Sequence, residues 1–485
     1  MLFNSYEYIF FFLPIVFFIY FYLNSIKLTE ASKAFLVISS LFFYSWWNIT
    51  YLPIILSSMI INYSVGKSFE KKNNKIIKNR NKIIFIIGIF FNLLLLGYFK
   101  YTDFMITNIN FISDLNIPTL NIVLPLAISF FTFQQIAYLV DSYKGETEEY
   151  DLLNYALFVT FFPQLIAGPI VHHKEMMPQF TSKKNKIISY KNIALGLFVF
   201  SIGLFKKVII ADTFSIWATN GFDKAELLTF FEAWAVSLSY TFQIYFDFSG
   251  YTDMAIGAAL LFNIKLPINF NSPYKALNIQ DFWRRWHITL SRFLRDYIYI
   301  PLGGNRNGSS MTNVNLFATF LLGGIWHGAG WTFVIWGALH AIAIVIYITY
   351  RNLRFSMNKI IAWFITFNFI NFTWIFFRAK ELDDAFKVLN GMVGLSGFIL
   401  HPYLENRLGF MLNYGIEFKM WLTLFEPKKF VFILLLSLFL ISLKNSNELQ
   451  KDFKPDIVKF IFVLTLLIYS VLNISSYSEF LYFDF

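Results

Sequence analysis

The sequence predicts an all-α polytopic membrane protein. Three observations predict this class. Of the 485 residues 57% are hydrophobic and only 14% are charged, which leaves too little polar surface for a soluble protein of this length. Apolar runs recur along the chain, and the span rule of roughly 20 residues gives about 11 to 13 membrane segments, some of them broken or re-entrant. The Lys and Arg residues behind the net charge of +10 lie mainly between these runs, where they set topology and contact anionic lipid rather than nucleic acid.

No soluble domain, internal repeat or low-complexity stretch separates the apolar runs, so residues 1–485 are predicted to form a single domain. Within it, residues 281–341 carry the densest motifs and residues 430–472 hold a C-terminal helix pair. The apolar runs are residues 9–23, 34–65, 83–99, 122–140, 152–171, 193–217, 230–248, 254–262, 316–348, 360–377, 430–443 and 457–472.

The first runs also predict orientation. The N-terminal stretch MLFNSYEYIFFFLPIVFFIYFYL has no basic residues before its apolar core and no small-residue cleavage site after it, so it is predicted to be a retained first span rather than a signal peptide. Residues 34–65 are long enough for two spans with a break at 48–53. The loop at 67–82, KSFEKKNNKIIKNRNK, is strongly basic and is therefore predicted to be cytoplasmic. Two crossings in 34–65 would place the N-terminus outside, which we prefer.

Several runs are interrupted by helix breakers. Two prolines, Pro118 and Pro125, flank the start of the run at 122–140, and FFPQLIAGPI carries Pro163, Gly168 and Pro169. Broken backbone at membrane depth survives only where protein or a water-filled cavity satisfies it. The sequence therefore predicts a fold that encloses a polar interior.

A polar stripe supports this prediction. In YTFQIYFDFSGYTD, the residues Tyr240, Gln243, Asp247 and Tyr251 share one face of a helix that is otherwise apolar. The stripe would either face a substrate cavity or clamp neighbouring helices by hydrogen bonds, and the residues alone favour neither.

The segment that begins DFWRRWHITLSRFLRDY has the pattern of an amphipathic helix lying in a membrane interface. One face is apolar, and the other carries arginines that either anchor lipid headgroups or hold the phosphates of a nucleotide-containing donor. His287 lies at the edge of the apolar face. The candidate binding residues of this segment are Trp283, Arg284, Arg285, Trp286, Arg292 and Arg295.

His327, in LLGGIWHGAGWTFVIWGALHA, is the strongest candidate for chemistry. The glycines around it are expected to weaken the helix and to let a substrate approach the backbone, while Trp326, Trp331 and Trp336 form rigid walls. A neutral imidazole at membrane depth suits proton abstraction from a hydroxyl, so a catalytic role is favoured over a structural one. His340 is predicted to have a structural or supporting role. The chain has no cysteine, which excludes an acyl-cysteine intermediate, and no spacing predicts a metal site.

Together, NFNSPYKALNIQDFWRRWHITLSRFLRDYIYIPLGGNR and GGIWHGAGWTFVIWGALH resemble the membrane-bound O-acyltransferase (MBOAT) superfamily. SFFTFQQIAYLVDSYKG, FFPQLIAGPI and NFTWIFFRAKELDDAF are similar to its bacterial branch of alginate O-acetyltransferase membrane subunits. The resemblance implies a helical bundle around a transmembrane tunnel. It also implies that His327 is the family's near-invariant histidine and His287 its second histidine. Residues 395–428 match no named motif.

The resemblance further implies an O-acetyltransferase of the bacterial cytoplasmic (inner) membrane. Acetyl-CoA would be the cytoplasmic donor substrate, with no bound cofactor, and an extracytoplasmic polysaccharide the final acceptor. Members of the family commonly work with an extracytoplasmic acetyltransferase of the SGNH type, so the resemblance implies such an enzyme, or another acceptor protein, as the partner. The absence of a soluble catalytic domain in this sequence is consistent with that expectation. The alternatives are a D-alanyl, lipid or protein O-acyltransferase of the same superfamily, and a transporter or flippase without chemistry.

Overall fold

The structure is a computed structural model that describes residues 1–69, 75–147, 151–421, 426–474 and 480–481. Almost all regular structure in these residues is helical, and the only strands there are a short parallel pair, β1 (Phe398–Leu400) and β2 (Ile416–Phe418). Six helical stretches among the described residues are long and apolar enough to cross a membrane. They are Glu7–Ser25, Ile49–Lys67, Lys75–Ser113, Tyr190–Lys224, Trp331–Asn352 and Lys359–Arg378.

The prediction of an all-α polytopic membrane protein is therefore confirmed. The expected total of about 11 to 13 segments also counted shorter apolar helices, such as α22 (Ile457–Leu472). That total stays a prediction, as does the transmembrane tunnel.

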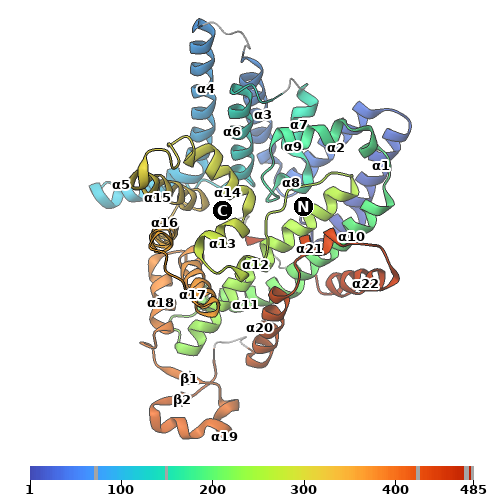
Figure 1. Ribbon diagram of the computed structural model, residues 1–485. Helices are drawn as coiled ribbons and strands as arrows, with labels where there is room; N and C mark the ends of the chain where they lie inside the picture. Colours follow the sequence, from blue (N-terminus) through green and yellow to red (C-terminus); the bar gives the residue numbers. More distant parts are fainter. Residues whose placement is uncertain (70–74, 148–150, 422–425, 475–479, 482–485) are drawn as a thin grey trace. The chain divides into compact units, whose positions relative to one another are not determined.

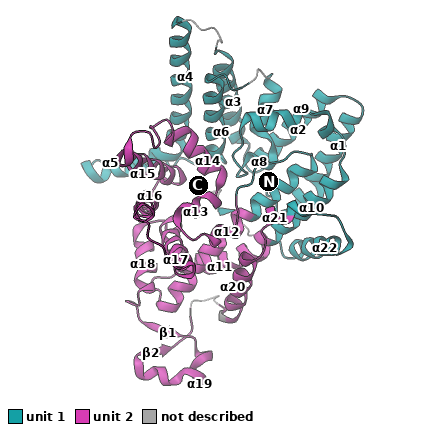
Figure 2. Ribbon diagram, in the orientation of Figure 1, with its two compact units in different colours: residues 1–205, 250–269, 450–485 teal, residues 206–249, 270–449 magenta. Residues whose placement is uncertain are grey.

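The chain divides into two compact units, each built from separate stretches of sequence (Figure 2). Unit 1 comprises residues 1–205, 250–269 and 450–485, and unit 2 comprises residues 206–249 and 270–449. One long helix, α12 (Phe230–Leu261), contributes residues to both. The single-domain assignment stays a prediction.

Unit 1 is a bundle of helices in which α1 packs on α2, α4 on α6, and α10 on α22 (Figure 1). Its interrupted stretches are broken as predicted, because residues 114–127 are not helical and α7 and α8 are separate pieces. Its α-helices besides α12 are α1 (Leu13–Ser25), α2 (Thr29–Ser45), α3 (Leu52–Lys67), α4 (Lys75–Leu96), α5 (Thr102–Ser113), α6 (Ile128–Tyr143), α7 (Leu152–Thr160), α8 (Phe162–Leu165), α9 (His173–Thr181), α10 (Tyr190–Phe205) and α22.

Unit 2 holds both candidate histidines. In it α15 packs along α16, α16 along α17, and α13 against α16. A short helix, α21 (Ser446–Lys451), runs from this unit into unit 1. The other α-helices of unit 2 are α11 (Asp212–Thr219), α13 (Ile279–Arg285), α14 (Ile288–Leu294), α15 (Gly308–His327), α16 (Trp331–Asn352), α17 (Lys359–Arg378), α18 (Leu382–Met392), α19 (Glu405–Leu408) and α20 (Pro427–Ser442).

Residues 34–65 do form two helices, α2 and α3, with a break at Asn48, whose side chain caps the next turn. The basic loop at 67–82 is partly helical, because α4 begins at Lys75. Residues 70–74 of that loop lie outside the described residues, and its cytoplasmic location stays a prediction.

The two apolar runs predicted at 230–248 and 254–262 are one continuous helix of 32 residues, α12. The polar residues between them do not end the helix, because they are buried against neighbouring helices. In unit 1, a Cβ atom built at Gly203 of α10 would lie only 2.5 Å from the carbonyl oxygen of Gly250. Gly250 is thus at a close helix–helix crossing rather than at a break.

The C-terminal segments exist as helices but not as an isolated pair. α20 lies in unit 2, where Phe430 contacts the ring of Trp217 at a centroid distance of 5.3 Å. α22 lies in unit 1 and packs along α10. The described part of residues 395–428 holds β1, α19 and β2, which the sequence did not predict.

Candidate active site

His327 is the last residue of α15. Residues Gly328 to Gly330 then reverse the chain, and α16 begins at Trp331. The two helices cross closely at Gly324. A Cβ atom there would lie 2.5 Å from the carbonyl oxygen of Phe333, so the crossing requires glycine. The predicted local weakening of the helix is met on one side of His327 only. α15 ends at His327, before Gly328, but it continues through Gly323 and Gly324, and Gly324 serves close packing.

Aromatic rings enclose His327, whose side chain is buried with only 4% of the residue exposed. Its ring centroid lies 4.8 Å from that of Trp326, 5.2 Å from Trp336 and 5.0 Å from Phe377 of α17. Two of the three predicted tryptophan walls are therefore present. Trp331 is 55% exposed, so it is not part of this buried wall; at the first position of α16 its side chain points to the surface.

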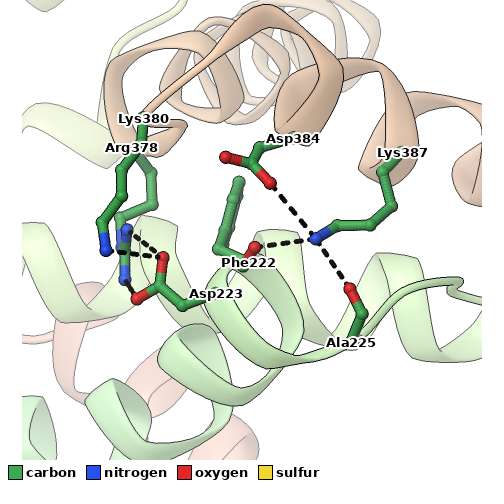
Figure 3. A network of polar contacts seen from close by, with 7 residues as sticks. All are labelled: Phe222, Asp223, Ala225, Arg378, Lys380, Asp384 and Lys387. Atoms are coloured by element: carbon green, nitrogen blue, oxygen red, sulfur yellow. Dashed lines mark hydrogen bonds and ion pairs between the residues drawn. The ribbon is translucent and has the colours of Figure 1, made fainter.

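A polar network holds Arg378 at the end of α17 (Figure 3). Arg378 directly follows Phe377 in the chain. Arg378 donates from both terminal nitrogens to the carboxylate of Asp223, at 3.1 and 2.6 Å. Lys387 of α18 donates to two backbone carbonyls of the segment around Asp223, at 2.7 and 2.8 Å. Bidentate charged hydrogen bonds fix geometry as well as strength, so this network positions one wall around His327.

His287 does not lie on a continuous interfacial helix, and that expectation is wrong. α13 ends at Arg285, Trp286 is extended, and His287 adopts a left-handed conformation with φ of 43° before α14 begins. The break allows tertiary packing to bury the apolar face inside the protein instead of in lipid. Trp286 is 2% exposed and lies against the ring of Trp374 at 4.9 Å.

His287 itself is fully buried, and its ring lies 4.8 Å from that of Phe248 of α12. It lies outside the six candidate spans. Burial lowers the pKa of His287 to about 3, so its imidazole is neutral near pH 7. The aromatic layer connects the two histidines, because Trp374 contacts Trp286 and also stacks on Trp336 at 5.9 Å.

The arginines of this segment differ in their surroundings. Arg284 is exposed, whereas Arg285 is half-buried and donates to Asp281 at 3.0 Å. Arg292 is half-buried, and the exposed Arg295 pairs with its neighbour Asp296 at 2.7 Å. The expected outward direction thus holds for Arg284 and Arg295. Whether they bind lipid or donor phosphates stays a prediction.

Of the polar stripe on α12, all four members are buried. Asp247 forms an ion pair of 2.6 Å with Lys207, which also pairs with Asp212 of α11 at 2.8 Å. This favours the clamp interpretation for Asp247. Tyr251 stacks on Phe3 within unit 1, at 4.8 Å. Substrate binding by Gln243, Asp247 and Tyr251 stays a prediction.

Sequence reasoning missed Lys207 and Asp212. The signal was present, because Lys207 interrupts the apolar run at 193–217, and ionisable residues at membrane depth are costly and usually paired. His340 is fully buried and accepts a hydrogen bond at its Nδ1 from Trp283 Nε1, at 3.2 Å. The contact fixes the orientation of the His340 ring, and the predicted supporting role of His340 stays a prediction. Among the described residues no cluster of three or more His, Asp or Glu could hold a metal ion.

Fold and site together define a class: a multi-pass helical membrane protein with an imidazole buried among aromatic rings. Comparison with known proteins identifies the family. A family model described as MBOAT, membrane-bound O-acyltransferase family, matches residues 142–380. The chain belongs to this family and is an O-acyltransferase, so a carrier without chemistry is set aside.

Relatives match the chain to different extents. The peptidoglycan O-acetyltransferase of Helicobacter pylori is 51% identical over 100% of this chain and 98% of its own length. The probable alginate O-acetylase AlgI of Pseudomonas aeruginosa is 38% identical over 81% of this chain and 75% of its own length. The teichoic acid D-alanyltransferase of Bacillus subtilis is 28% identical over 54% of this chain and 71% of its own length.

Proposed function

We propose that the protein moves acetyl groups from cytoplasmic acetyl-CoA across the bacterial inner membrane for O-acetylation of an envelope polysaccharide, and that the polymer is peptidoglycan. The choice of polymer is carried by the relative that matches the whole chain, which is named a peptidoglycan O-acetyltransferase. An alginate-like polymer is the second candidate, because the relatives named alginate O-acetylases match 81% of the chain.

His327 is the general base of this proposal, and its burial in an aromatic shell at the end of α15 is the observation that supports the role. The acceptor oxygen forms a bond to the thioester carbonyl carbon while the imidazole takes the hydroxyl proton. The C–S bond then breaks, and the leaving sulfur takes the proton back from the imidazolium as the thiol of CoA. General base catalysis of this kind contributes about 10²- to 10⁴-fold in rate.

His287 acts as a neutral group, since its low pKa excludes a cation near pH 7. A neutral imidazole can orient a reactant by accepting or donating one hydrogen bond. The exposed guanidinium groups of Arg284 and Arg295 suit the diphosphate of a CoA donor. The immediate acceptor is a hydroxyl on an extracytoplasmic SGNH-type acetyltransferase, which completes transfer to the glycan.

The test is a mass-spectrometric comparison of envelope glycans from cells that lack the protein and cells that carry wild type or His327→Asn. We expect O-acetylated peptidoglycan with wild type and near-complete loss with His327→Asn at equal membrane levels. His401→Asn is the matched control, because His401 lies in the loop after β1, where its side chain accepts a hydrogen bond from the backbone N–H of Tyr403. Normal acetylation with His327→Asn would overturn the assignment, and loss confined to another polymer would overturn the choice of peptidoglycan.

A further inference from the structure

Three polar side chains follow one face of α16 at intervals of four residues: Thr332, Trp336 and His340. Residues four apart on a helix are neighbours on its surface, separated along the axis by about 6 Å. The three are 2%, 2% and 0% exposed. We call them the α16 stripe.

Each residue of the α16 stripe carries a buried polar atom without a hydrogen-bond partner within the part of the chain that the structure describes. These atoms are Thr332 Oγ1, Trp336 Nε1 and His340 Nε2. Buried polar groups are almost always hydrogen-bonded, so each such atom needs an explanation. Three of them in succession on one helix face point to a bound molecule as their partner.

The chemistry of two of these atoms defines what they bind. The indole nitrogen of Trp336 can only donate. His340 accepts at Nδ1 from Trp283 Nε1, at 3.2 Å, and because a neutral imidazole has one donor nitrogen, its proton is on Nε2. Both atoms are therefore donors, and the partner that satisfies two donors is an acceptor oxygen.

The position of the α16 stripe relates it to the reaction. The ring centroid of Trp336 lies 5.2 Å from that of His327 and 4.8 Å from that of His340. Trp336 also stacks on Trp374 and contacts Phe377 at 5.0 Å, which fixes its plane. The two donors thus lie on the same side of α16 as the candidate base.

We propose that Trp336 and His340 are catalytic residues that donate hydrogen bonds to the carbonyl oxygen of the acyl donor. This inference rests on the proposed function. The hydroxyl oxygen that receives the acetyl group bonds to the carbonyl carbon while His327 takes the hydroxyl proton. The C=O electron pair then moves onto the carbonyl oxygen, where the two N–H groups stabilise the negative charge. When the C–S bond breaks, the carbonyl re-forms and the sulfur leaves with the proton. Thr332 provides the next polar contact along the donor.

The experiment measures acetyl transfer by the purified full-length protein with acetyl-CoA and with its dithioester analogue, in which sulfur replaces the carbonyl oxygen. Trp336→Phe removes the indole N–H and keeps a large ring. His340→Asn keeps an oxygen near the Nδ1 position that accepts from Trp283, and removes the Nε2 donor. Loss of one such donor typically lowers kcat about 10²- to 10³-fold, and we expect this with a little-changed KM.

The dithioester separates catalysis from packing. Sulfur is a weak hydrogen-bond acceptor, so wild type should be much slower with the dithioester than with acetyl-CoA, and each variant should lose most of that difference. His340→Gln, whose amide reaches the Nε2 position, should recover part of the rate. Trp363→Phe is the matched control, because its indole N–H has a partner in the fold, the carbonyl oxygen of Tyr274 at 2.9 Å.

Two outcomes would overturn the inference. In the first, Trp336→Phe and His340→Asn keep kcat within a few fold of wild type. In the second, both variants lose activity while the ratio of the rate with acetyl-CoA to the rate with the dithioester stays that of wild type. The second outcome would indicate a packing role or a bound water only. Failure of the proposed function looks different, since then wild type transfers no acetyl group, or His327→Asn remains as active as wild type.

Discussion

Unit 2 contains two buried polar regions that differ in how their polar groups are paired. Around Lys207, one ammonium meets two carboxylates, those of Asp212 and Asp247, at 2.8 and 2.6 Å. Along the α16 stripe, by contrast, three buried polar atoms have no hydrogen-bond partner among the described residues. A buried charge without a partner costs several kcal/mol, and each carboxylate of the Lys207 cluster has the ammonium group as an ion-pair partner.

The difference separates the parts of the molecule that hold the fold from those that act on a substrate. Groups satisfied within the chain, like Lys207, clamp helices together. Groups that the chain leaves unsatisfied, in a shell that also contains His327, are completed by a bound molecule.

The largest effect is expected for Lys207→Met. Removing the ammonium leaves two carboxylates without their buried partner, and breaking a buried pair from one side costs about 3–5 kcal/mol of unfolding free energy. Denaturant unfolding of the purified protein in detergent measures this change in unfolding free energy. Lys206→Met, the adjacent half-buried lysine, is the control and should cost less. Unchanged stability of Lys207→Met would show that the cluster is not a clamp.

A smaller effect is expected for Gly324→Val, which tests whether the α15–α16 crossing positions His327. Its Cβ would lie 2.5 Å from the carbonyl oxygen of Phe333 and 2.9 Å from Gly337, and overpacking of this kind costs about 1–3 kcal/mol. We also expect a lower transfer rate, because His327 is three residues away on the same helix. Gly323→Ala is the control, since its Cβ meets only a Leu294 side-chain atom, at 3.2 Å. Equal stability of both variants would contradict the tight crossing.

The smallest effect concerns pH and His287. Burial lowers the pKa of His287 to about 3 in the folded protein, below its ordinary 6.5. Between these values the unfolded chain binds a proton that the folded protein does not. Lowering the pH through this range therefore lowers the free energy of unfolding, and His287 contributes at most about 1.4 kcal/mol per pH unit to that loss. Between pH 7.5 and pH 5.5, the free energy of unfolding should fall less for His287→Gln than for wild type or His401→Gln. An equal decline would mean that His287 is not buried as a neutral group.

Much of the fold could be predicted from the sequence because apolar runs and helix breakers act locally. The break at Asn48, the pieces around Pro163 and the span of α22 all follow from such signals. The continuity of α12 could not be predicted in this way. Its polar residues look like a break between two apolar runs, and only tertiary packing shows that they are buried within one helix. The left-handed His287 was likewise hidden, because packing of Trp286 rather than local preference breaks that helix.

The site was predicted in its residue types more than in its arrangement. His327 and Trp326 were singled out correctly as buried neighbours, because histidine and tryptophan among glycines at membrane depth are unusual. The sequence could not show that Trp331 faces outward or that Phe377 of α17 completes the shell. Both depend on how α15, α16 and α17 pack together, which no local pattern specifies.

The most direct test of the central assignment is the transfer of a labelled acetyl group from acetyl-CoA by purified wild type and His327→Asn in lipid nanodiscs. We expect the variant to fold, to bind acetyl-CoA and to transfer the acetyl group at least about 10²-fold more slowly than wild type. Transfer by a folded His327→Asn at the wild-type rate would show that the base is another residue.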